Sequence, residues 1–386
     1  MSPVQRRAGP SPELAPYHQR MTDDQCELPD FWAVVPAGGS GTRLWPISRS
    51  KRPKFLLDIT GNGRTLLQTA WDRLTPLCGS RFLLVTGTAH ELEARRQLPG
   101  LSERSMLIEP APRDSMAAIG LAAATLEARD PELILGSFPA DHVIPNANGL
   151  HDCIRQGYAA AKTGLLALIG LEPTRPTSAL GYIRMGPAIG IDAAPGARRI
   201  ESFIEKPSED RAIRFIHAGG YVWNAGMWIA KAGVLMGLLE SANPQLAGDL
   251  RAAVKYPDRL IDIWENIERT TIDKTIAEPL AGTPKVCIIP GDFEWEDIGD
   301  FGALLAYLNR HEPSVDLHAI PNADEIFCLD ATGVVVGNSH RPIAVMGLDN
   351  VVIVDTQDAL LVMSEEYSQR LKDLYADVTL ARPEVG

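Results

Sequence analysis

A glycine-rich segment that follows an apolar run is the part of the chain best suited to bind phosphate. Residues 36–43 read Pro-Ala-Gly-Gly-Ser-Gly-Thr-Arg, after the strand-like run 32–37. Glycines let backbone N–H groups approach an anion without a Cβ in the way. Arg43 lies beside the glycines and Lys54 follows, so two cations are available to neutralise a triphosphate and its pyrophosphate leaving group. The loop from Gly38 to Lys54 is therefore predicted to bind phosphate.

Two common phosphate-binding loops do not match this segment. A Walker loop requires Gly-Lys-Ser/Thr at a fixed spacing, and Leu44 occupies the last glycine position of the dinucleotide pattern G-x-G-x-x-G. Kinase and dehydrogenase functions are therefore disfavoured. A glycine turn flanked by solvated bases is the structural alternative, but the glycines, Arg43 and Lys54 together in one segment favour phosphate binding.

The elements that would position this loop follow a βαβ rhythm. Strands are expected at 32–37, 82–85, 106–108, 133–138 and 165–169, and helices at 66–74, 90–98, 115–129 and 151–162. This rhythm predicts a mostly parallel sheet with helices on both faces. Ligands of such sheets lie at the carboxyl ends of the strands, which indicates residues 38–54, 109–115 and 139–142.

The second half of the chain is less regular. We interpret residues 177–290 as an elaborated half of the same domain, with strands at 200–204, 226–230 and 285–289 and helices at 211–217, 233–240 and 258–267. A helix at 301–309 and a polar linker at 311–322 precede short strand-like stretches at 326–329, 334–336, 343–345, 351–354 and 360–362. These stretches show no clean repeat and are too few for an independently stable solenoid. We expect the appendage to pack on the first domain or on a second subunit, as in a homodimer.

Composition narrows the function classes. The 386 residues carry a net charge of −12, with 45% hydrophobic and 22% charged residues, which is typical of a soluble globular protein. An acidic chain is a poor general binder of nucleic acid. No apolar run is long enough to span a bilayer, and the first thirty residues lack the apolar segment of a signal peptide, so a cytoplasmic location without membrane association is expected.

The five cysteines are widely separated and form no C-x-x-C pair, so neither a disulfide framework nor a zinc site is indicated. Residues 1–30 are rich in proline and polar side chains and are predicted to be a disordered extension.

Several further segments occur in an order typical of one family. They are Phe-Pro-Ala-Asp-His at 138–142, Gly-Tyr-Ile at 181–183, Phe-Ile-Glu-Lys-Pro at 203–207, Trp-Asn-Ala-Gly-Met at 223–227 and Trp-Glu-Asp-Ile-Gly at 295–299. With the loop at 36–46, they make the sequence resemble the sugar-nucleotide pyrophosphorylases, in the mannose-1-phosphate guanylyltransferase branch, from about residue 32 to the C-terminus. The resemblance implies an α/β fold. A Rossmann-like nucleotidyltransferase domain with a mixed, mostly parallel sheet would span 31–312, and a small β-rich appendage would span 313–386.

The resemblance also implies roles for individual residues. Asp141 and Asp297 would bind Mg²⁺, the expected cofactor. The structural alternative is a helix or turn cap for Asp141 and a cap of the helix at 301–309 for Asp297. The catalytic cations would be Arg43, Lys54 and Lys206. The sugar would be bound by Gly181, Glu205 and Asn224, where turn residues or a surface ion pair are the structural alternatives. The nucleotide would be bound by Ala37, Gly38, Gly39, Gly41, Thr42, Glu109, Asp114 and Ser115.

The sequence departs from the family pattern in two of the segments that are expected to bind the nucleotide. Asp114 and Ser115 stand where relatives often have Asn and Thr. Asp114 can still accept hydrogen bonds from N1–H and the amino group of guanine, although taken alone it is better explained as the N-cap of the next helix. Phe55 directly follows Lys54, where many relatives place Gln between the two. Lys54 keeps its register with the preceding motif.

The expected reaction is attack by the phosphate oxygen of a sugar 1-phosphate on the α-phosphorus of GTP, which forms a GDP-sugar and pyrophosphate. Mannose 1-phosphate is the first choice of acceptor, and a heptose 1-phosphate or a cyclitol 1-phosphate is the alternative. A rival of another class is a non-catalytic regulator that binds nucleotide sugars. The chain leaves no room for an added isomerase domain, so phosphomannose isomerase activity is not expected.

Overall fold

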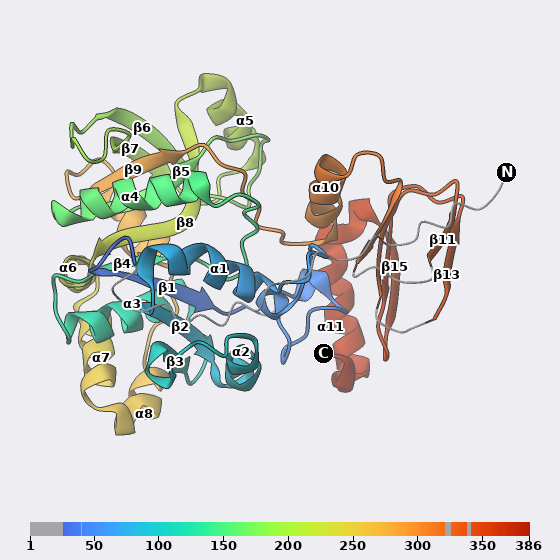
Figure 1. The fold of residues 1–386 in the computed structure, drawn as a ribbon, viewed down its shortest axis with the longest axis horizontal. Coiled ribbons are helices and arrows are strands. Elements are labelled where there is room, and N and C mark those ends of the chain that lie inside the picture. The colour runs from blue at the N-terminus through green and yellow to red at the C-terminus, as the bar shows by residue number, and fades with distance from the viewer. Residues whose placement is uncertain (1–25, 40, 321–325, 338–340) are drawn as a thin grey trace.

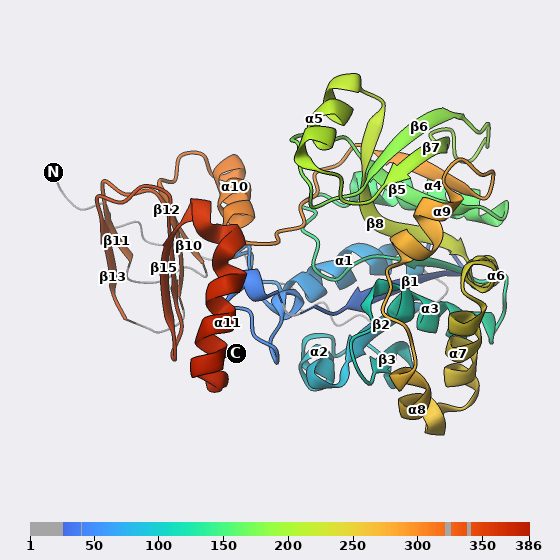
Figure 2. The same ribbon diagram turned by 180° about the vertical axis from the view of Figure 1, so that it is seen from behind.

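A nine-stranded sheet forms the centre of the larger part of the molecule (Figures 1 and 2). This computed structural model describes residues 26–39, 41–320, 326–337 and 341–386, so most of the predicted N-terminal extension lies outside the described residues. The strand order is β3-β2-β1-β4-β8-β5-β9-β7-β6. The strands are β1 Phe31–Ala37, β2 Phe82–Gly87, β3 Met106–Glu109, β4 Ile134–Ser137, β5 Leu166–Leu171, β6 Tyr182–Ala188, β7 Arg198–Ile204, β8 Tyr221–Lys231 and β9 Val286–Gly291.

The predicted mixed α/β sheet is confirmed, but its parallel share is smaller than expected. Strands β1 to β4 pair in parallel, and β5 pairs in parallel with β9. Strand β8 runs antiparallel to both β4 and β5, and β6 and β7 also pair antiparallel with their neighbours. Strand β6 and the first residues of β8 were not predicted from sequence, because Pro187 lies in β6 and Gly226 has a φ of 67° inside β8. Both residues break a strand pattern.

Helices cover both faces of this sheet, as expected for a βαβ chain. They are α1 Leu66–Cys78, α2 Glu91–Gln97, α3 Asp114–Glu127, α4 Asn148–Lys162, α5 Glu209–Ala218, α6 Ala232–Ala242, α7 Pro244–Lys255, α8 Leu260–Glu265 and α9 Glu278–Leu280. The sequence analysis missed α7, although Asn243 caps it by accepting from Leu246 N–H and Pro244 begins it. That pair is a helix-start signal.

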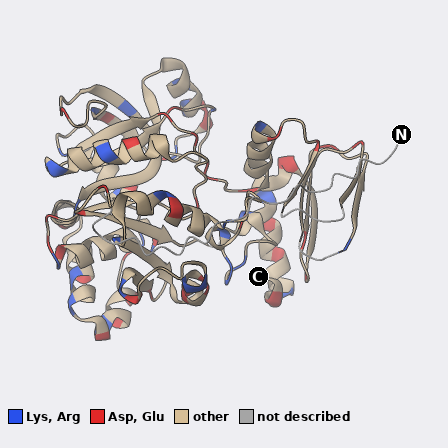
Figure 3. Ribbon diagram, viewed as in Figure 1, with Lys and Arg blue, Asp and Glu red and all other residues tan. Residues whose placement is uncertain are grey.

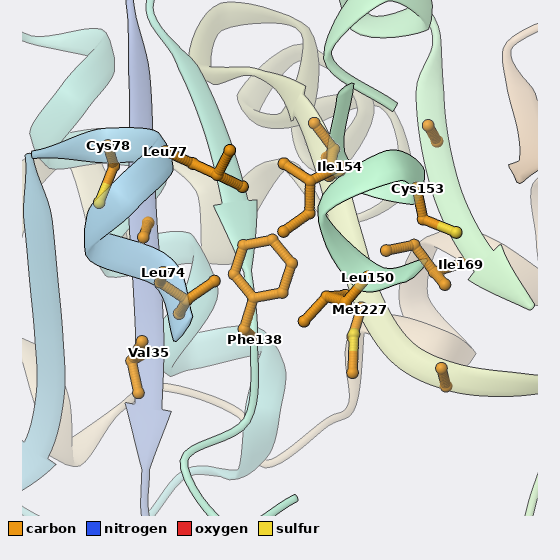
Figure 4. Close-up of a cluster of buried hydrophobic side chains, with 14 of the residues drawn as sticks. Val35, Leu74, Leu77, Cys78, Phe138, Leu150, Cys153, Ile154, Ile169 and Met227 are labelled. Atoms are coloured by element: carbon orange, nitrogen blue, oxygen red, sulfur yellow. The ribbon is translucent and has the colours of Figure 1, made fainter. Parts of the chain in front are cut away.

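Successive residues of β1 face two separate hydrophobic cores. Val35 contributes to the core beneath α1 and α4, whereas Val34 contributes to the core beneath α3, α6 and α7. Figure 4 shows the first core, where Phe138 lies between Leu74 and Leu77 of α1 and Leu150 and Ile154 of α4. Phe138 follows β4, so this packing fixes the backbone just before Asp141.

The C-terminal part is a short β-helix flanked by α10 Phe301–His311 and α11 Leu371–Ala381. Its sheets are β10-β12-β14-β15 and β11-β13. The strands are β10 Leu317–Ile320, β11 Ile326–Leu329, β12 Gly333–Gly337, β13 Ile343–Met346, β14 Val351–Asp355 and β15 Leu360–Ser364. Both views place α10 and α11 between these strands and the larger part (Figures 1 and 2).

The sequence shows no clean fixed-period repeat in this region, and the strand pairing explains why. Residue 317 pairs with 333 and 333 with 351, whereas 326 pairs with 343, so successive turns are offset by sixteen to eighteen residues. The varying offset and the short strands concealed the period. Strand β10 was taken for linker, and α11 was missed. As expected, the appendage packs on the first domain, because Leu44 and Trp45 share one core with Val334, Val352 and Leu371.

Basic and acidic residues are interspersed along the ribbon (Figure 3). Within the described ranges, no helix is both long enough and apolar enough to cross a membrane.

Replacing Phe138 with alanine tests the importance of the first core for stability. Its side chain is 1% exposed, so we expect the variant to lose about 3–5 kcal/mol of unfolding free energy in denaturant titration. Leu92→Ala on α2 is the control, because Leu92 is 64% exposed. A loss below about 1 kcal/mol for Phe138→Ala would contradict this assignment.

Candidate active site

The loop after β1 combines one glycine required by packing with two that face open space. A Cβ built on Gly41 would lie 2.8 Å from Ser48 Oγ and 3.2 Å from Lys54 Cβ, and its φ is 57°. No heavy atom lies within 4 Å of the position that a Cβ would take on Gly38 or Gly39. Gly41 thus lets the loop close onto Lys54, while the other two leave backbone approachable by an anion.

The Lys54 ammonium lies between two carboxylates. Its Nζ is 2.8 Å from Asp297 Oδ1 and 3.2 Å from Asp141 Oδ2. The Lys54 side chain is 7% exposed, whereas Asp141 and Asp297 are 33% and 43% exposed. The lysine stem is therefore packed in protein, and the carboxylates remain accessible to a ligand.

Electrostatics keeps Lys54 and Asp297 charged. Burial acts to lower the pKa of Lys54, but Asp141 and then Asp297 outweigh it and raise that pKa above its ordinary value. Burial acts to raise the pKa of Asp297, yet Lys54 outweighs it, with smaller contributions from His142 and then Arg43, and the pKa lies well below its ordinary value. Because the Asp297 side chain is 43% exposed, Coulombic attraction prevails there over desolvation.

A two-residue backbone bridge brings Asp141 and Asp297 together. Val143 N–H donates to Glu296 O at 2.9 Å, and Glu296 N–H donates to Val143 O at 3.0 Å. The neighbouring rings of His142 and Trp295 pack edge to face, with centroids 5.2 Å apart. Burial lowers the pKa of His142 to about 4, so this imidazole is neutral near pH 7. His142 is therefore a packing residue of the bridge.

Arg43 approaches the same cluster from the loop. Its guanidinium packs along Gly299, where a Cβ would lie 3.4 Å from Arg43 Nη2. Arg43 Nη1 donates to Gln369 Oε1 at 2.9 Å. Gln369 carried no signal in the sequence, because 326 positions separate it from Arg43 and it belongs to no motif.

The three predicted sugar-binding residues form a second group. Asn224 N–H donates to Gly181 O at 2.8 Å, and a Cβ on Gly181 would lie 2.6 Å from Glu205 Oε2. Lys206 has a φ of 48°, and its side chain is 62% exposed, with Nζ 3.5 Å from Glu205 Oε1. This group lies near Asp141. A Cβ on Gly226, two residues after Asn224, would lie 4.0 Å from Cγ of Pro139, two residues before Asp141.

Asp273 joins this second group and was not foreseen from sequence. Asn224 Nδ2 donates to Asp273 Oδ1 at 2.6 Å, while Asn224 Oδ1 accepts from Gly226 N–H at 3.1 Å. Burial, and then the nearby Glu205, raise the pKa of Asp273 to about 6. Asp273 begins a single π-helical turn, Asp273–Ala277, a geometry often found at functional sites.

The predicted nucleotide residues lie along the same edge of the sheet. Ala37 pairs with Thr86 of β2, and Gly87 of β2 pairs with Glu109 of β3, so Glu109 lies two strands away from the phosphate loop. Glu109 is buried and its Oε1 has no hydrogen-bond partner. Burial raises the pKa of this carboxyl to about 7.

Asp114 and Ser115 begin α3, and the structure corrects one alternative for them. The helix begins at Asp114 with Arg113 as its N-cap residue, so Asp114 is not the cap. Asp114 adopts a φ of 62°. Ser115 Oγ accepts from Ile272 N–H at 3.2 Å, which ties α3 to the segment before Asp273.

The described residues hold no cluster of three or more His, Cys, Asp or Glu side chains suited to a metal ion. Asp141 and Asp297 are thus a pair of carboxylates, which is a donor set that Mg²⁺ accepts when phosphate and water complete its shell.

Thr42, another of the residues predicted to bind the nucleotide, lies in the 3₁₀ turn Thr42–Leu44 beside α11.

Comparison with known proteins supports a common origin for this arrangement. The nucleotidyl transferase family model matches residues 32–312, and the MannoseP isomerase/GMP-like beta-helix domain model matches residues 324–376. The alginate biosynthesis protein AlgA of Pseudomonas fluorescens is 30% identical over 353 residues, which cover 88% of this chain and 70% of that protein. A mannose-1-phosphate guanylyltransferase of Klebsiella pneumoniae is 31% identical over 347 residues, 88% of this chain and 72% of that protein.

A similar architecture occurs in a crystal structure from Thermus thermophilus, described as a mannose-1-phosphate geranyltransferase. The TM-score is 0.79 at 29% identity, with 90% of this chain and 99% of that chain covered.

The burial of the unpaired Glu109 carboxyl can be tested without a ligand by the pH dependence of the melting temperature. The folded chain holds this proton up to about pH 7, whereas the unfolded chain releases it near 4.5, so the carboxyl reduces stability as pH rises through that interval. We expect Glu109→Gln to raise the melting temperature relative to the parent protein, with a difference that grows from pH 4.5 to 7. Glu103→Gln, at an exposed position before β3, is the control. A difference that does not change with pH would contradict the burial of Glu109.

Proposed function

Because the chain belongs to the nucleotidyl transferase family, we propose that it transfers GMP from GTP to a sugar 1-phosphate, with mannose 1-phosphate as the preferred acceptor. The observation that carries this proposal is the Lys54 ammonium held between Asp141 and Asp297 beside an open glycine loop. This arrangement suits the charge that develops when pyrophosphate leaves a triphosphate.

The proposed step requires no general base. An oxygen of the sugar phosphate is already anionic and forms a new bond to the α-phosphorus of GTP. The bond from that phosphorus to the α,β-bridging oxygen breaks, and pyrophosphate leaves with the electron pair. Catalysis then rests on positioning and on charge stabilisation.

Each proposed cation has its own part in this step. Lys54 and Arg43 would stabilise the triphosphate and the departing pyrophosphate, because both lie at the loop. Lys206 would bind the phosphate of the sugar 1-phosphate, since its ammonium is exposed beside Glu205, one of the predicted sugar-binding residues. Backbone N–H groups of Ala37, Gly38, Gly39, Gly41 and Thr42 would hold phosphate oxygens.

Mg²⁺ is the proposed cofactor, with Asp141 and Asp297 as its protein ligands. When bound, it would neutralise negative charge on the phosphate groups. The pair fits this role because both carboxylates are partly exposed and face one shared cation, Lys54. Mg²⁺ is usually bound by one or two carboxylates together with substrate phosphates.

Guanine recognition is proposed for Glu109 and Asp114. A buried carboxylate oxygen without a partner is unfavourable until a ligand donates to it. Guanine offers two donors on one edge, N1–H and the amino group. The name of the mannose-1-phosphate guanylyltransferase relative supports the same base.

Acceptor recognition is proposed for Gly181, Glu205 and Asn224, with Asp273 behind them. Asn224 retains one N–H and one lone pair after its internal bonds, so it can donate to one hydroxyl and accept from another. We place the enzyme in the cytoplasm, where GTP and sugar phosphates are made, and a homodimer remains a prediction.

A substrate panel tests the function directly. The parent protein would be incubated with Mg²⁺, one of the four common nucleoside triphosphates, and mannose, heptose or cyclitol 1-phosphate. We expect GDP-mannose and pyrophosphate in equal amounts, with GTP and mannose 1-phosphate as the best pair. Binding of nucleotide sugars without turnover over the whole panel would instead identify a regulator.

Lys54→Met tests the central cation. The methionine fills the buried space of the lysine stem, so we expect a folded protein whose rate of pyrophosphate release falls by at least about 100-fold. Lys51→Met, an exposed lysine in the same loop, is the matched control and should retain parental activity. Near-parental turnover by Lys54→Met would remove this residue from the mechanism.

A further inference from the structure

The C-terminal segment 365–386 packs directly on the phosphate loop. Helix α11 contacts the turn Thr42–Leu44, and Leu44 and Trp45 share a core with Leu371 and Val385. Trp45 Nε1 donates to Val385 O at 2.8 Å. The appendage therefore supplies part of the surface on which the loop rests.

Arg49 forms a second attachment between the loop and the appendage. Its Nη2 lies 2.8 Å from Asp358 Oδ1, and its guanidinium also donates to Val385 O. The Arg49 side chain is 16% exposed, so these bonds are partly shielded from water. Both ends of the segment Thr42–Arg49 are thus held by residues from the C-terminal part.

One side chain of the appendage reaches a residue of the proposed reaction. Gln369 Oε1 accepts from Arg43 Nη1 at 2.9 Å, and Gln369 Nε2 donates to Asp300 Oδ2. Asp300 is 5% exposed, and its other oxygen accepts from Ala303 N–H at 3.0 Å at the start of α10. Because Asp300 can only accept, the amide nitrogen of Gln369 must face it. The amide oxygen is thereby directed to Arg43.

The turn that carries Gln369 is itself fixed against α10. The 3₁₀ turn Glu365–Arg370 packs so closely on Gly302 that a Cβ there would lie 2.6 Å from Glu365 Oε1 and 3.4 Å from Ser368 Oγ. Ser368 is buried and its Oγ donates to Glu365 O at 2.6 Å. Gln369 therefore projects from a rigid support, although its own side chain is exposed.

We propose that Gln369 is a positioning residue, through which the C-terminal appendage orients the Arg43 guanidinium toward the triphosphate of the nucleotide. An arginine side chain loses considerable rotamer entropy when it is held in one geometry. The hydrogen bond to Gln369 restricts the Arg43 side chain before the nucleotide binds, since Arg43 is already directed along Gly299 toward Asp297. Arg43 therefore loses less rotamer entropy when the nucleotide binds. The inference rests on the proposed function, because it takes GTP as the ligand of Arg43.

The test is a double-mutant cycle with Gln369→Ala, Arg43→Met and the double variant, in the full-length chain. For Gln369→Ala alone we expect kcat/KM for GTP to fall about 5- to 10-fold, as for one partly exposed hydrogen bond to a charged group. KM for the sugar 1-phosphate and the melting temperature should stay at parental values. In the Arg43→Met background, Gln369→Ala should have no further effect, because the guanidinium that Gln369 binds has already been removed.

Arg370→Ala, at the exposed neighbour of Gln369, is the matched control and should leave all parameters unchanged. Equal effects of Gln369→Ala with and without Arg43, or no effect at all, would overturn the inference. The affinity for GTP, measured by isothermal titration over the same cycle, separates this failure from that of the proposed function. If the parent protein forms no GDP-sugar, the proposed function fails, whereas the coupling of Gln369 and Arg43 in GTP affinity still tests the inference.

Discussion

The ion triad of Lys54, Asp141 and Asp297 is the interaction on which the rest of the site depends. A buried ammonium is unfavourable unless it is paired, and here two carboxylates pair it at 2.8 and 3.2 Å. The three residues come from the loop after β1, the segment after β4 and the segment before α10. Their pairing therefore fixes three distant parts of the chain relative to one another. It also concentrates both signs of charge where a triphosphate, a cation and a second phosphate would meet.

The rest of the fold can be understood as support for that triad. The first core packs Phe138 beneath the strand end that leads to Asp141, and the bridge between Val143 and Glu296 sets Asp297 beside it. The antiparallel strand β8 brings Asn224 to the same edge of the sheet, near the end of β5. The C-terminal part closes the remaining side through contacts with Arg43 and Trp45. The appendage is thus continuous with the active-site architecture.

Sequence reasoning recovered what is encoded locally or in motifs. The glycine loop, the βαβ half of the sheet and the α/β class followed from spacing and periodicity, and the family resemblance supplied the mixed sheet, Asp141 and Asp297. It missed features set by tertiary contact. Asp273 and Gln369 act through side chains far away in sequence, which no periodicity records. The β-helix was not predicted because its turns vary in length. Strand β6 was missed because Pro187 interrupts its pattern, and only residues 226–230 of β8 were predicted because Gly226 interrupts that strand.

The rate of pyrophosphate release by Asp297→Asn, measured beside its melting temperature, shows whether the triad of Lys54, Asp141 and Asp297 is the catalytic centre. Asparagine keeps the shape of the side chain and removes the charge that faces Lys54. If the triad is the catalytic centre, we expect a rate at least about 100-fold below that of the parent protein, with a melting temperature within a few degrees of it. If the triad were only a structural ion pair, the variant would melt at a clearly lower temperature and still turn over GTP and mannose 1-phosphate at a near-parental rate. That result would show that the triad is not the catalytic centre.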